Sequence, residues 1–462
     1  MQTTNTAAAP LDVTRLDEEF NGRVVGPAGA DYDEMRAVTA GGIDRRPAAI
    51  VRVADARDVA RAVALAQETG LELAVRSGGH SAAGHGTTEG GIVIDLRDLD
   101  ALEIDVPGRT AWAGAGLTAG AYTAAAAEHG LATGFGDTGS VGLGGLITGG
   151  GIGYLSRKHG LTIDNLLAAE VVTADGRVLE VDAERHPELF WAIRGGGGNV
   201  GVVTRFRLRL HPIDGFVGGI LVLPATADVV AGFIAAAEAA PDEVSTIANV
   251  MPAPPMPFLP EDRHGELVVL AMLAHAGDTD AADAALAPFR ALAEPYADLV
   301  RPMAYPEMFP PDDPDYHPTA VATTMFMDHV GLAEAETIVE RLRASDAQMR
   351  VAQLRVLGGA VARVPADATA YAHRSSRILV NLAAFYTGDE ERRQRQAWVD
   401  DFAARLDQGV PGAYVNFVGD EGQERVRAAY PAATYERLAA VKRRYDPDNL
   451  FRLNQNVPPA AG

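Results

Sequence analysis

Two histidines, His80 and His85, lie in the first of three glycine-rich loops, which run over residues 76–86, 134–153 and 194–201. Glycine allows positive φ and lets backbone amides approach a ligand closely, and consecutive exposed N–H groups form concave sites for anions. Three such loops in one part of the chain indicate a long ligand with a pyrophosphate in its middle. Tight turns without a ligand are the alternative, and spacing alone does not decide between the two.

The segment GGGNVG, residues 196–201, fits the dinucleotide pattern G-x-G-x-x-G. That pattern binds a pyrophosphate where it follows a strand and opens a helix. Here it follows a predicted helix, residues 187–193, and leads into a predicted strand, residues 202–210. An NAD enzyme of the Rossmann type is therefore disfavoured, and the chain contains neither GxxxxGKS nor GxxxxGKT, the signatures of a P-loop.

Composition excludes several other classes of protein. The 462 residues are enough for two or three compact units. A net charge of −22 disfavours nucleic acid and anionic membranes as partners. The chain has no cysteine, which excludes disulfides and thiolate metal sites, and we expect no metal site. Because the N-terminus lacks the pattern of a signal peptide and no stretch is apolar enough to span a bilayer, we expect a cytoplasmic protein.

The first loop is expected to connect elements of a strand-and-helix pattern that continues to about residue 105. Strands are predicted over residues 47–53, 71–75 and 91–96, and a helix runs from its N-cap Asp55 to Gly70. A hairpin with an Asp175-Gly176 turn is predicted over residues 170–181.

After Pro212 the glycine clusters stop. Strand-like runs, such as residues 267–273 and 323–328, alternate with alanine-rich helices, and a proline-rich connector covers residues 251–260. These features predict a second α/β unit with an antiparallel sheet. In its strand over residues 377–386, alternation puts Leu379, Asn381 and Ala383 on one face. The tail is predicted to end in a helix over residues 435–445 and an irregular segment.

Four longer motifs carry a family resemblance: RSGGHS at 76–81, TGSVGLGGLITGGGIGYLSRKHGLTIDN at 138–165, LFWAIRGGGGNVGVVT at 189–204 and YDPDNLFRLNQN at 445–456. With them the chain resembles, over nearly its whole length, the berberine-bridge-enzyme-like oxidoreductases, which belong to the vanillyl-alcohol-oxidase type of FAD flavoproteins.

The resemblance implies a mixed α+β fold built around a bipartite PCMH-type FAD-binding domain. That domain would take residues 1–212, with its core at about 43–212, and would be completed by the C-terminal segment 413–462. Residues 213–412 would form a substrate-binding domain with an antiparallel sheet and flanking helices.

The resemblance also implies FAD bound covalently through a bond to His80. The loop 76–81 would wrap the pyrophosphate, residues 198–202 would border the ADP part, and Asn456 would help to tie the tail to the FAD domain. The implied cofactor-binding residues are Arg76, Ser77, Gly78, Gly79, His80, Ser81, Thr138, Gly139, Val141, Gly144, Gly145, Gly153, Gly198, Asn199, Gly201, Val202, Tyr414, Asn416 and Asn454.

Two positions refine this expectation. Many relatives form a second flavin bond from a cysteine at the position of Thr138; without cysteine, only the histidyl bond is expected. Val141 stands at a position that controls the access of oxygen to the flavin in the family, and valine at this position is typical of oxidases. O2 is therefore the expected electron acceptor, with H2O2 as the by-product.

Hydride transfer from an alcohol also needs a base for the hydroxyl proton. The tyrosine and glutamate that serve relatives are replaced here by Phe417 and Asn381. The remaining candidates for a base are Tyr386, His329 and Tyr414. Alternatively, the substrate is an amine, which needs no such base, or an activated phenolic or polyketide-type molecule handled by bound water.

We therefore expect an FAD-dependent oxidase that takes a hydride from a small or medium organic molecule, whether amine, alcohol or phenolic. The alternatives are a flavin dehydrogenase that uses another electron acceptor and a flavin-binding protein without turnover.

Overall fold

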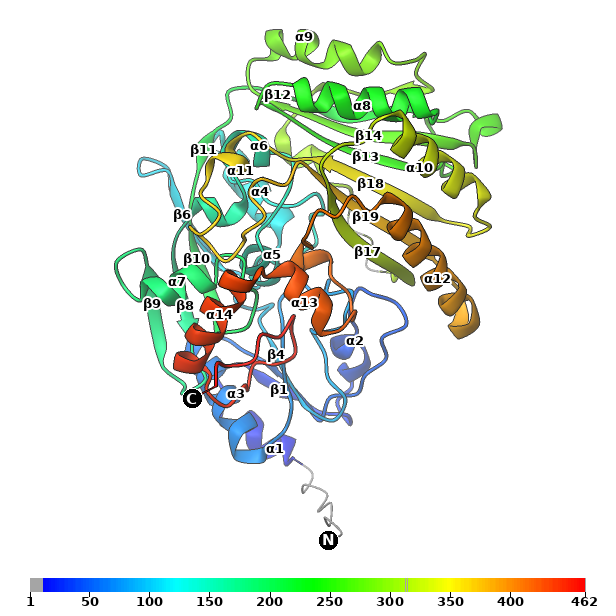
Figure 1. The fold of residues 1–462 in the computed structure, drawn as a ribbon. Helices are drawn as coiled ribbons and strands as arrows, with labels where there is room; N and C mark the ends of the chain where they lie inside the picture. The colour runs from blue at the N-terminus through cyan, green and yellow to red at the C-terminus, as the bar shows by residue number, and fades with distance from the viewer. Residues whose placement is uncertain (1–10, 312, 314, 462) are drawn as a thin grey trace.

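The computed structural model describes residues 11–311, 313 and 315–461, and its fold is mixed α and β, as predicted (Figure 1). The first sheet has the strand order β1-β2-β4-β3, and its last three strands are parallel. Its strands are β1 (Arg23–Val25), β2 (Ala49–Arg52), β3 (Leu73–Arg76) and β4 (Ile92–Asp95).

Helix α3 (Ala56–Thr69) connects β2 to β3 and has the ends that the sequence predicts. The Asp55 side chain accepts hydrogen bonds from the backbone N–H groups of Arg57 and Asp58, and Gly70 ends the helix at φ 68°. No helix joins β3 to β4, so the expected alternation is wrong at this point. The first glycine loop takes the place of a second crossover helix.

A second sheet is antiparallel throughout, in the order β5-β6-β10-β8-β9. The predicted hairpin is confirmed as β8 and β9, with Gly176 at φ 75° in its turn. The strands of this sheet and of a small pair beside it are β5 (Leu102–Asp105), β6 (Thr110–Gly114), β8 (Leu166–Val172), β9 (Val178–Asp182), β10 (Val202–Arg209), β7 (Leu131–Ala132) and β11 (His211–Pro212).

Short helices surround these two sheets. They are α1 (Val13–Asp17), α2 (Tyr32–Arg36), α4 (Ala119–Ala127), α5 (Leu143–Gly149), α6 (Ser156–His159) and α7 (Pro187–Ala192). Helix α5 and the turn after it are formed by the second glycine loop.

The third sheet has eight strands, and its pairings are antiparallel, as predicted. Its strands are β12 (Phe216–Pro224), β13 (Val244–Pro252), β14 (Leu267–Ala276), β15 (Ala297–Asp298), β16 (Arg301–Pro302), β17 (Ala320–Met327), β18 (Arg350–Val356) and β19 (Ile378–Phe385). Helices α8 (Ala227–Ala239), α9 (Thr279–Arg290), α10 (Leu332–Ala344) and α12 (Gly388–Leu406) lie on its outer side, and α11 (Ala360–Arg363) lies near α6 (Figure 1).

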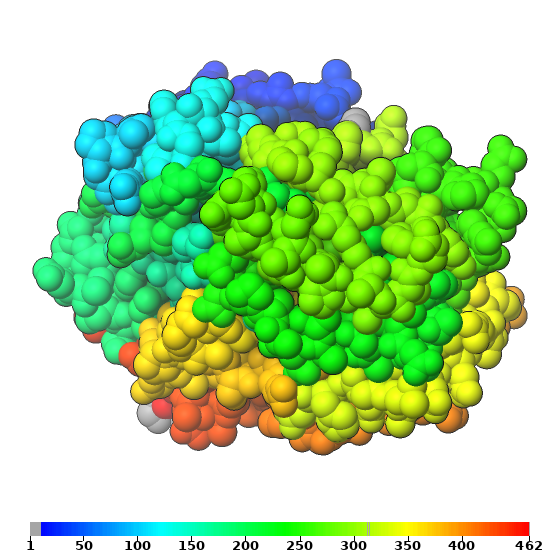
Figure 2. Space-filling model, turned by 90° about the horizontal axis from the view of Figure 1, so that it is seen from above, coloured from blue at the N-terminus to red at the C-terminus, as the bar shows by residue number. Residues whose placement is uncertain are grey.

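The third sheet lies between two hydrophobic cores. Ile378, Val380 and Leu382 of β19 pack with α8, α10 and α12, whereas Leu379 packs with the core of the first two sheets. The predicted alternation of β19 is therefore confirmed. In the view from above, the third sheet and its helices (green and yellow) lie on one side of the molecule. The cyan and teal segments of the first part of the chain lie on the other side (Figure 2).

The C-terminal segment returns to the first part of the chain. Tyr430, Leu438 and Phe451 are buried in the core that the first two sheets share. Helix α13 (Gln423–Ala429) precedes α14 (Ala432–Tyr445), which begins three residues before the predicted helix and packs against α7. In the described part of the chain, no helix is long and apolar enough to cross a membrane.

Candidate functional site

A cavity of about 490 Å³ opens between the glycine loops, the third sheet and the C-terminal segment. This volume lies in the range of ligand and cofactor sites. Among the residues predicted to bind a cofactor or substrate, the cavity is lined by Arg76, Ser77, Gly78, Gly79, His80, Ser81, Thr138, Val141, Gly144, Gly145, Gly198, Gly201, Val202, Asn381, Tyr414, Asn416 and Asn454. Residues from all three loops and the tail thus meet at one site.

Strand β3 delivers the first loop to this cavity, and Arg76 holds the loop at its start. The Arg76 side chain is 2% exposed, and its Nη2 donates to Asp95 Oδ2 at 2.9 Å. Its Nη1 also donates to the carbonyl of Ala37 at 3.2 Å. Burial lowers the pKa of Arg76, while the carboxylate of Asp95 favours the charged form. The guanidinium is therefore engaged in the wall of the site.

The first and second loops touch backbone to backbone. A Cβ atom on Gly78 would lie 2.4 Å from the backbone N of Gly142, and one on Gly142 would lie 2.0 Å from Ser77 Oγ. The Ser77 hydroxyl donates to the carbonyl of Ala115 at 2.6 Å and accepts the N–H of Gly144 at 3.3 Å. Glycine at these two positions is what allows His80 to be held beside the second loop.

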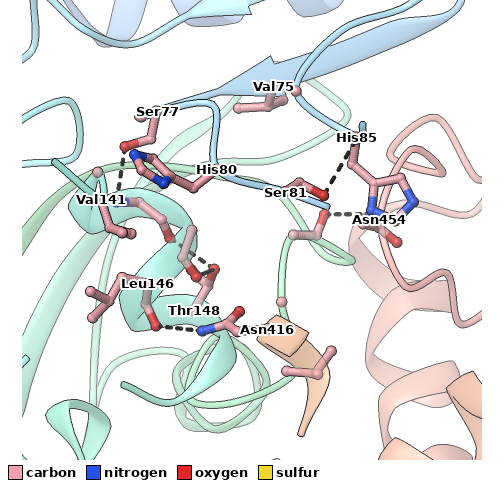
Figure 3. Close-up of a pocket in the computed structure, with 18 of the residues that line it drawn as sticks. Val75, Ser77, His80, Ser81, His85, Val141, Leu146, Thr148, Asn416 and Asn454 are labelled. Carbon is pink, nitrogen blue, oxygen red and sulfur yellow. Dashed lines mark hydrogen bonds between the residues drawn. The ribbon is translucent and has the colours of Figure 1, made fainter. Parts of the chain in front are cut away.

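The two histidines of the first loop differ in position. His80 lies between Ser77 and Val141 in the cavity wall, whereas His85 lies nearer to Asn454 (Figure 3). Burial lowers the pKa of His85 to about 4, so this ring is neutral at pH 7. Its backbone N–H donates to Ser81 Oγ at 3.4 Å.

Two of the predicted cofactor-binding glycines in the second loop, Gly139 and Gly153, do not line the cavity. Gly139 packs against Gly120, whose N–H donates to the Gly139 carbonyl at 2.8 Å. A Cβ on Gly153 would lie 1.9 Å from the carbonyl oxygen of Phe135. Gly153 is required for close packing behind the wall, and Gly139 contacts Gly120 there. A repeated glycine motif does not distinguish these positions from those that face a ligand.

Asn199 of the third loop is also outside the cavity wall. Its Nδ2 donates to the carbonyls of Gly196 at 2.8 Å and Gln455 at 3.1 Å, and its Oδ1 accepts the N–H of Val457 at 2.9 Å. Asn199 is 1% exposed. With its side chain engaged in this way, it joins the third loop to the C-terminal tail.

Three of the predicted cofactor-binding residues that line the cavity come from the tail, and two of them, Asn416 and Asn454, lie at different sides of it (Figure 3). The Tyr414 hydroxyl accepts the N–H of Gly151 at 3.0 Å and Nδ2 of Asn416 at 3.1 Å. Asn416 Nδ2 also donates to the carbonyl of Leu146 at 3.1 Å. Asn454 Nδ2 donates to the carbonyl of Gly198 at 3.2 Å. Asn456 does not line the cavity; its carbonyl accepts Nε2 of Gln423 at 3.4 Å.

The structure separates the candidate bases, of which only Tyr414 lines the cavity, from Asn381, which stands where relatives have a glutamate. Asn381 lines the cavity, but Tyr386 and His329 do not. Both lie beyond the ends of their strands, β19 and β17, which carries them past the cavity. The His329 side chain is 62% exposed and its Nε2 lies 3.4 Å from Glu334 Oε1. The positions of His329 and Tyr386 therefore do not support a role as a base in this cavity.

Sequence reasoning missed Asp137 and Arg355. Asp137 lies in the cavity wall and is the one carboxylate among the lining residues of the described chain. Its Oδ2 accepts Nη2 of Arg355 of β18 at 2.7 Å. Because Asp137 directly precedes Thr138 in the second glycine loop, its position could have indicated a site residue. No feature of the sequence indicates Arg355 as a site residue.

The cavity fits a dinucleotide such as FAD. A Cβ on Gly145 would meet no protein atom within 4 Å, so α5 leaves open space for a ligand at its glycine face. Oδ1 of Asn454 and Oδ1 of Asn381, in separate parts of the wall, are buried and have no hydrogen-bond partner among the described residues. Buried polar atoms normally have a partner, and a bound ligand would supply one.

Comparisons with known proteins agree with this geometry. A family model for an FAD binding domain matches residues 47–182, and one described as "Berberine and berberine like" matches residues 413–458. The (R)-6-hydroxynicotine oxidase of Paenarthrobacter nicotinovorans is 31% identical over 98% of this chain and 98% of its own length.

Solved structures give the same result for the fold. The structure of 6-hydroxy-D-nicotine oxidase from Arthrobacter nicotinovorans is 29% identical and has a TM-score of 0.84, covering 96% of this chain and 98% of its own. Chitooligosaccharide oxidase, at 22% identity and a TM-score of 0.83, covers 97% of this chain and 100% of its own and shares the fold.

Proposed function

Since the chain belongs to the berberine-bridge-enzyme-like family of FAD-dependent oxidoreductases, we propose that it is an oxidase that holds FAD through a single covalent bond to His80 and oxidises a small or medium organic amine. The observation that carries this proposal is the position of His80, in the wall of a cavity that three glycine loops enclose.

Residues 1–212 and 413–462 form the FAD-binding domain in this proposal, and residues 213–412 form the substrate-binding domain. The backbone of residues 77–81 and 142–145 binds the pyrophosphate, and Gly198, Gly201 and Asn454 border the ADP part. Tyr414 and Asn416 lie toward the flavin ring. When bound, FAD supplies the acceptor for two electrons, and the surrounding loops orient it and limit access of water.

The single bond follows from the residue types available. His80 lines the cavity, and the chain has no cysteine that could form a second bond at Thr138 or elsewhere. Acid precipitation tests this point: the pellet of the native protein is expected to stay yellow, and the pellet of His80→Ala to be colourless. His85→Asn is the matched control, because His85 also lines the cavity, and its pellet should remain yellow. A colourless native pellet would refute the covalent bond.

O2 as the electron acceptor is supported by Val141, which lines the cavity close to His80 (Figure 3). Stopped-flow mixing of the reduced protein with aerated buffer measures this directly. Fast reoxidation with formation of H2O2 is expected. Slow reoxidation, with fast electron transfer to an artificial acceptor, would identify a dehydrogenase instead.

An amine substrate is supported by the residues at the third-sheet end of the cavity. Asn381 and Phe417 line that end, and neither accepts a proton. A neutral amine provides the electron pair for the new C=N bond from its own nitrogen, so no hydroxyl proton has to be removed. One relative is named as an oxidase of 6-hydroxynicotine, a molecule that contains an amine nitrogen.

A screen of amines, sugars and phenols for anaerobic bleaching of the flavin tests the substrate class. Bleaching by amines is the expected result. Bleaching by sugars or phenols alone would overturn the amine proposal, and a flavin that no compound bleaches would favour a binding protein without turnover.

A further inference from the structure

One end of the cavity is built around Arg355. Its Nη2 donates to Asp137 Oδ2 at 2.7 Å, its Nη1 lies 3.5 Å from the carbonyl oxygen of Ile152, and its guanidinium carbon lies 5.1 Å from the centre of the Phe417 ring. Asp137, Ile152 and Phe417 all line the cavity, whereas Arg355 does not. The Arg355 side chain is 5% exposed, against 22% for Asp137. The cation therefore lies behind the wall and the carboxylate lies in it.

A row of hydrogen bonds across the third sheet fixes the orientation of this pair. Asn249 Nδ2 of β13 donates to the carbonyl of Leu270 at 3.1 Å, and Gln353 Nε2 of β18 donates to Asn249 Oδ1 at 2.8 Å. Because its amide nitrogen is used in this way, Gln353 presents Oε1 to Arg355, which donates from Nε at 3.0 Å and from Nη2 at 2.7 Å. Each group in the row thus determines the orientation of the next, and the row ends at Asp137.

Two oxygen acceptors without a hydrogen-bond partner in the described chain lie at this end. Asp137 Oδ1 receives no hydrogen bond from the described residues, because the contact with Arg355 is made by Oδ2. Asn381, paired with Gln353 in the sheet, lines the same end, and its Oδ1 is buried without a partner among the described residues. The positive charge of Arg355 is already bound to Asp137 and Gln353. A ligand that provides donors would therefore match these two oxygens.

We propose that Asp137 is the specificity-determining carboxylate of the substrate site, that it binds the positively charged N–H group of an amine, and that Arg355 is its positioning residue. This inference rests on the proposed function and narrows its substrate class. A protonated amine provides N–H donors and a positive charge when it binds, and it releases one proton to solvent before its nitrogen lone pair forms the C=N bond. An alcohol offers one neutral donor and a carboxylate offers none. The net charge of −22 also attracts cations to the protein at long range.

The test compares three probes of similar shape on the flavin-containing protein: benzylamine, benzyl alcohol and benzoate. Dissociation constants are measured by isothermal titration at pH 7.5. The native protein is expected to bind benzylamine about 10-fold or more tightly than benzyl alcohol, as a charge-assisted hydrogen bond predicts. It should bind benzoate weakest. Equal binding of the amine and the alcohol would overturn the inference.

Asp137→Asn keeps the shape of the side chain and removes its charge. It is expected to weaken benzylamine about 10- to 100-fold and to leave benzyl alcohol nearly unchanged. Asp164→Asn is the matched control, because Asp164 forms a buried pair with Arg374, at 2.7 Å and 2.8 Å, and does not line the cavity. That control should keep the preference for the amine. If Asp137→Asn weakened both probes equally, the carboxylate would have only a structural role.

Arg355 is tested by the ratio of the two dissociation constants, since a general loss of structure changes both. Arg355→Met is expected to reduce the preference for benzylamine, and Arg355→Lys to restore part of it. An unchanged ratio in Arg355→Met would refute the positioning role. The flavin colour of each acid pellet is recorded in the same preparations. A yellow pellet without amine preference would defeat this inference alone, whereas a colourless native pellet would defeat the covalent flavin proposal.

Discussion

Two buried tyrosines differ in what surrounds their hydroxyl groups. The Tyr414 hydroxyl accepts two N–H groups, those of Gly151 and Asn416, whereas the Tyr430 hydroxyl is buried without a hydrogen-bond partner in the described chain. The raised pKa of Tyr414 comes chiefly from burial, which opposes ionisation. A hydroxyl whose lone pairs are both engaged is poorly placed to take a proton, so we infer that Tyr414 chiefly holds the tail against the second loop.

Tyr414→Phe is therefore expected to lower the free energy of unfolding by about 1–3 kcal/mol, because two buried N–H groups lose their acceptor. Tyr430→Phe is the matched control and should cost little, because its hydroxyl has no partner to lose. Chemical denaturation of both variants measures the difference. If Tyr414→Phe kept its stability and instead lost about 100-fold or more in turnover, Tyr414 would be a catalytic base after all.

At the level of elements, the three glycine loops support one another. The second loop meets the first at Gly142, and the N–H groups of Gly195 and Gly197 in the third loop both donate to the carbonyl of Thr148 at 2.9 Å. One motif thus contains Gly142, which is in close contact with the first loop, and Gly145, beside which there is open space, and these glycines have different physical duties.

Substitutions to alanine should separate these duties. Gly142→Ala places a Cβ 2.0 Å from Ser77 Oγ and 2.3 Å from the backbone N of Gly78. This variant is expected to lose thermal stability and soluble yield. Gly145→Ala meets no protein atom within 4 Å, so the fold should be retained while flavin content, measured from the visible absorbance, falls. If Gly145→Ala lost stability while Gly142→Ala lost only flavin, packing between the loops would depend on Gly145 and not on Gly142.

At the scale of the whole molecule, α6 joins the first part of the chain to the third sheet. Arg157 donates to the carbonyls of Leu357 at 2.6 Å and Ala240 at 2.8 Å, and Lys158 Nζ donates to the carbonyl of Ala276 at 2.6 Å. Beside this junction the rings of His159 and His211 are stacked, with their centres 3.9 Å apart. Burial, with the neighbouring His211, lowers the pKa of His159 to about 3, and burial lowers that of His211 to about 4.

Acid is therefore expected to destabilise the protein before its carboxylates titrate. Both histidines are neutral when folded but titrate near pH 6.5 when unfolded, so the unfolded state binds more protons as the pH falls. Stability should be complete above about pH 6.5 and should decline progressively toward pH 4. Melting temperatures of the native protein and of His159→Phe, which keeps a stacked ring, measure this effect. The variant should lose less stability between pH 7 and 5; identical slopes would contradict the assignment.

The local features of this protein could be predicted from its sequence. Asp55 and Gly70 mark the ends of α3, Asp175-Gly176 marks a hairpin, and alternation in β19 identifies the face that carries Asn381. Each of these depends on neighbours within a few residues, where backbone geometry and side-chain type decide the outcome. The glycine motifs likewise located the cavity wall, including His80, although they did not distinguish Gly139 and Gly153 from glycines that face the ligand.

Contacts between distant parts of the chain were decided by the tertiary structure alone. Asp137 and Arg355 are 218 residues apart, and Asn199 and Gln455 are 256 residues apart, yet each pair is joined by a hydrogen bond. Tyr386 and His329 looked equivalent to Tyr414 as candidate bases, but of the three only Tyr414 lines the cavity. The sequence by itself determined the family, the glycine loops and the place of His80 in a loop of the cavity wall. Which carboxylate faces the substrate end depended on how the third sheet packs over the second loop, because only that packing brings a buried cation to Asp137.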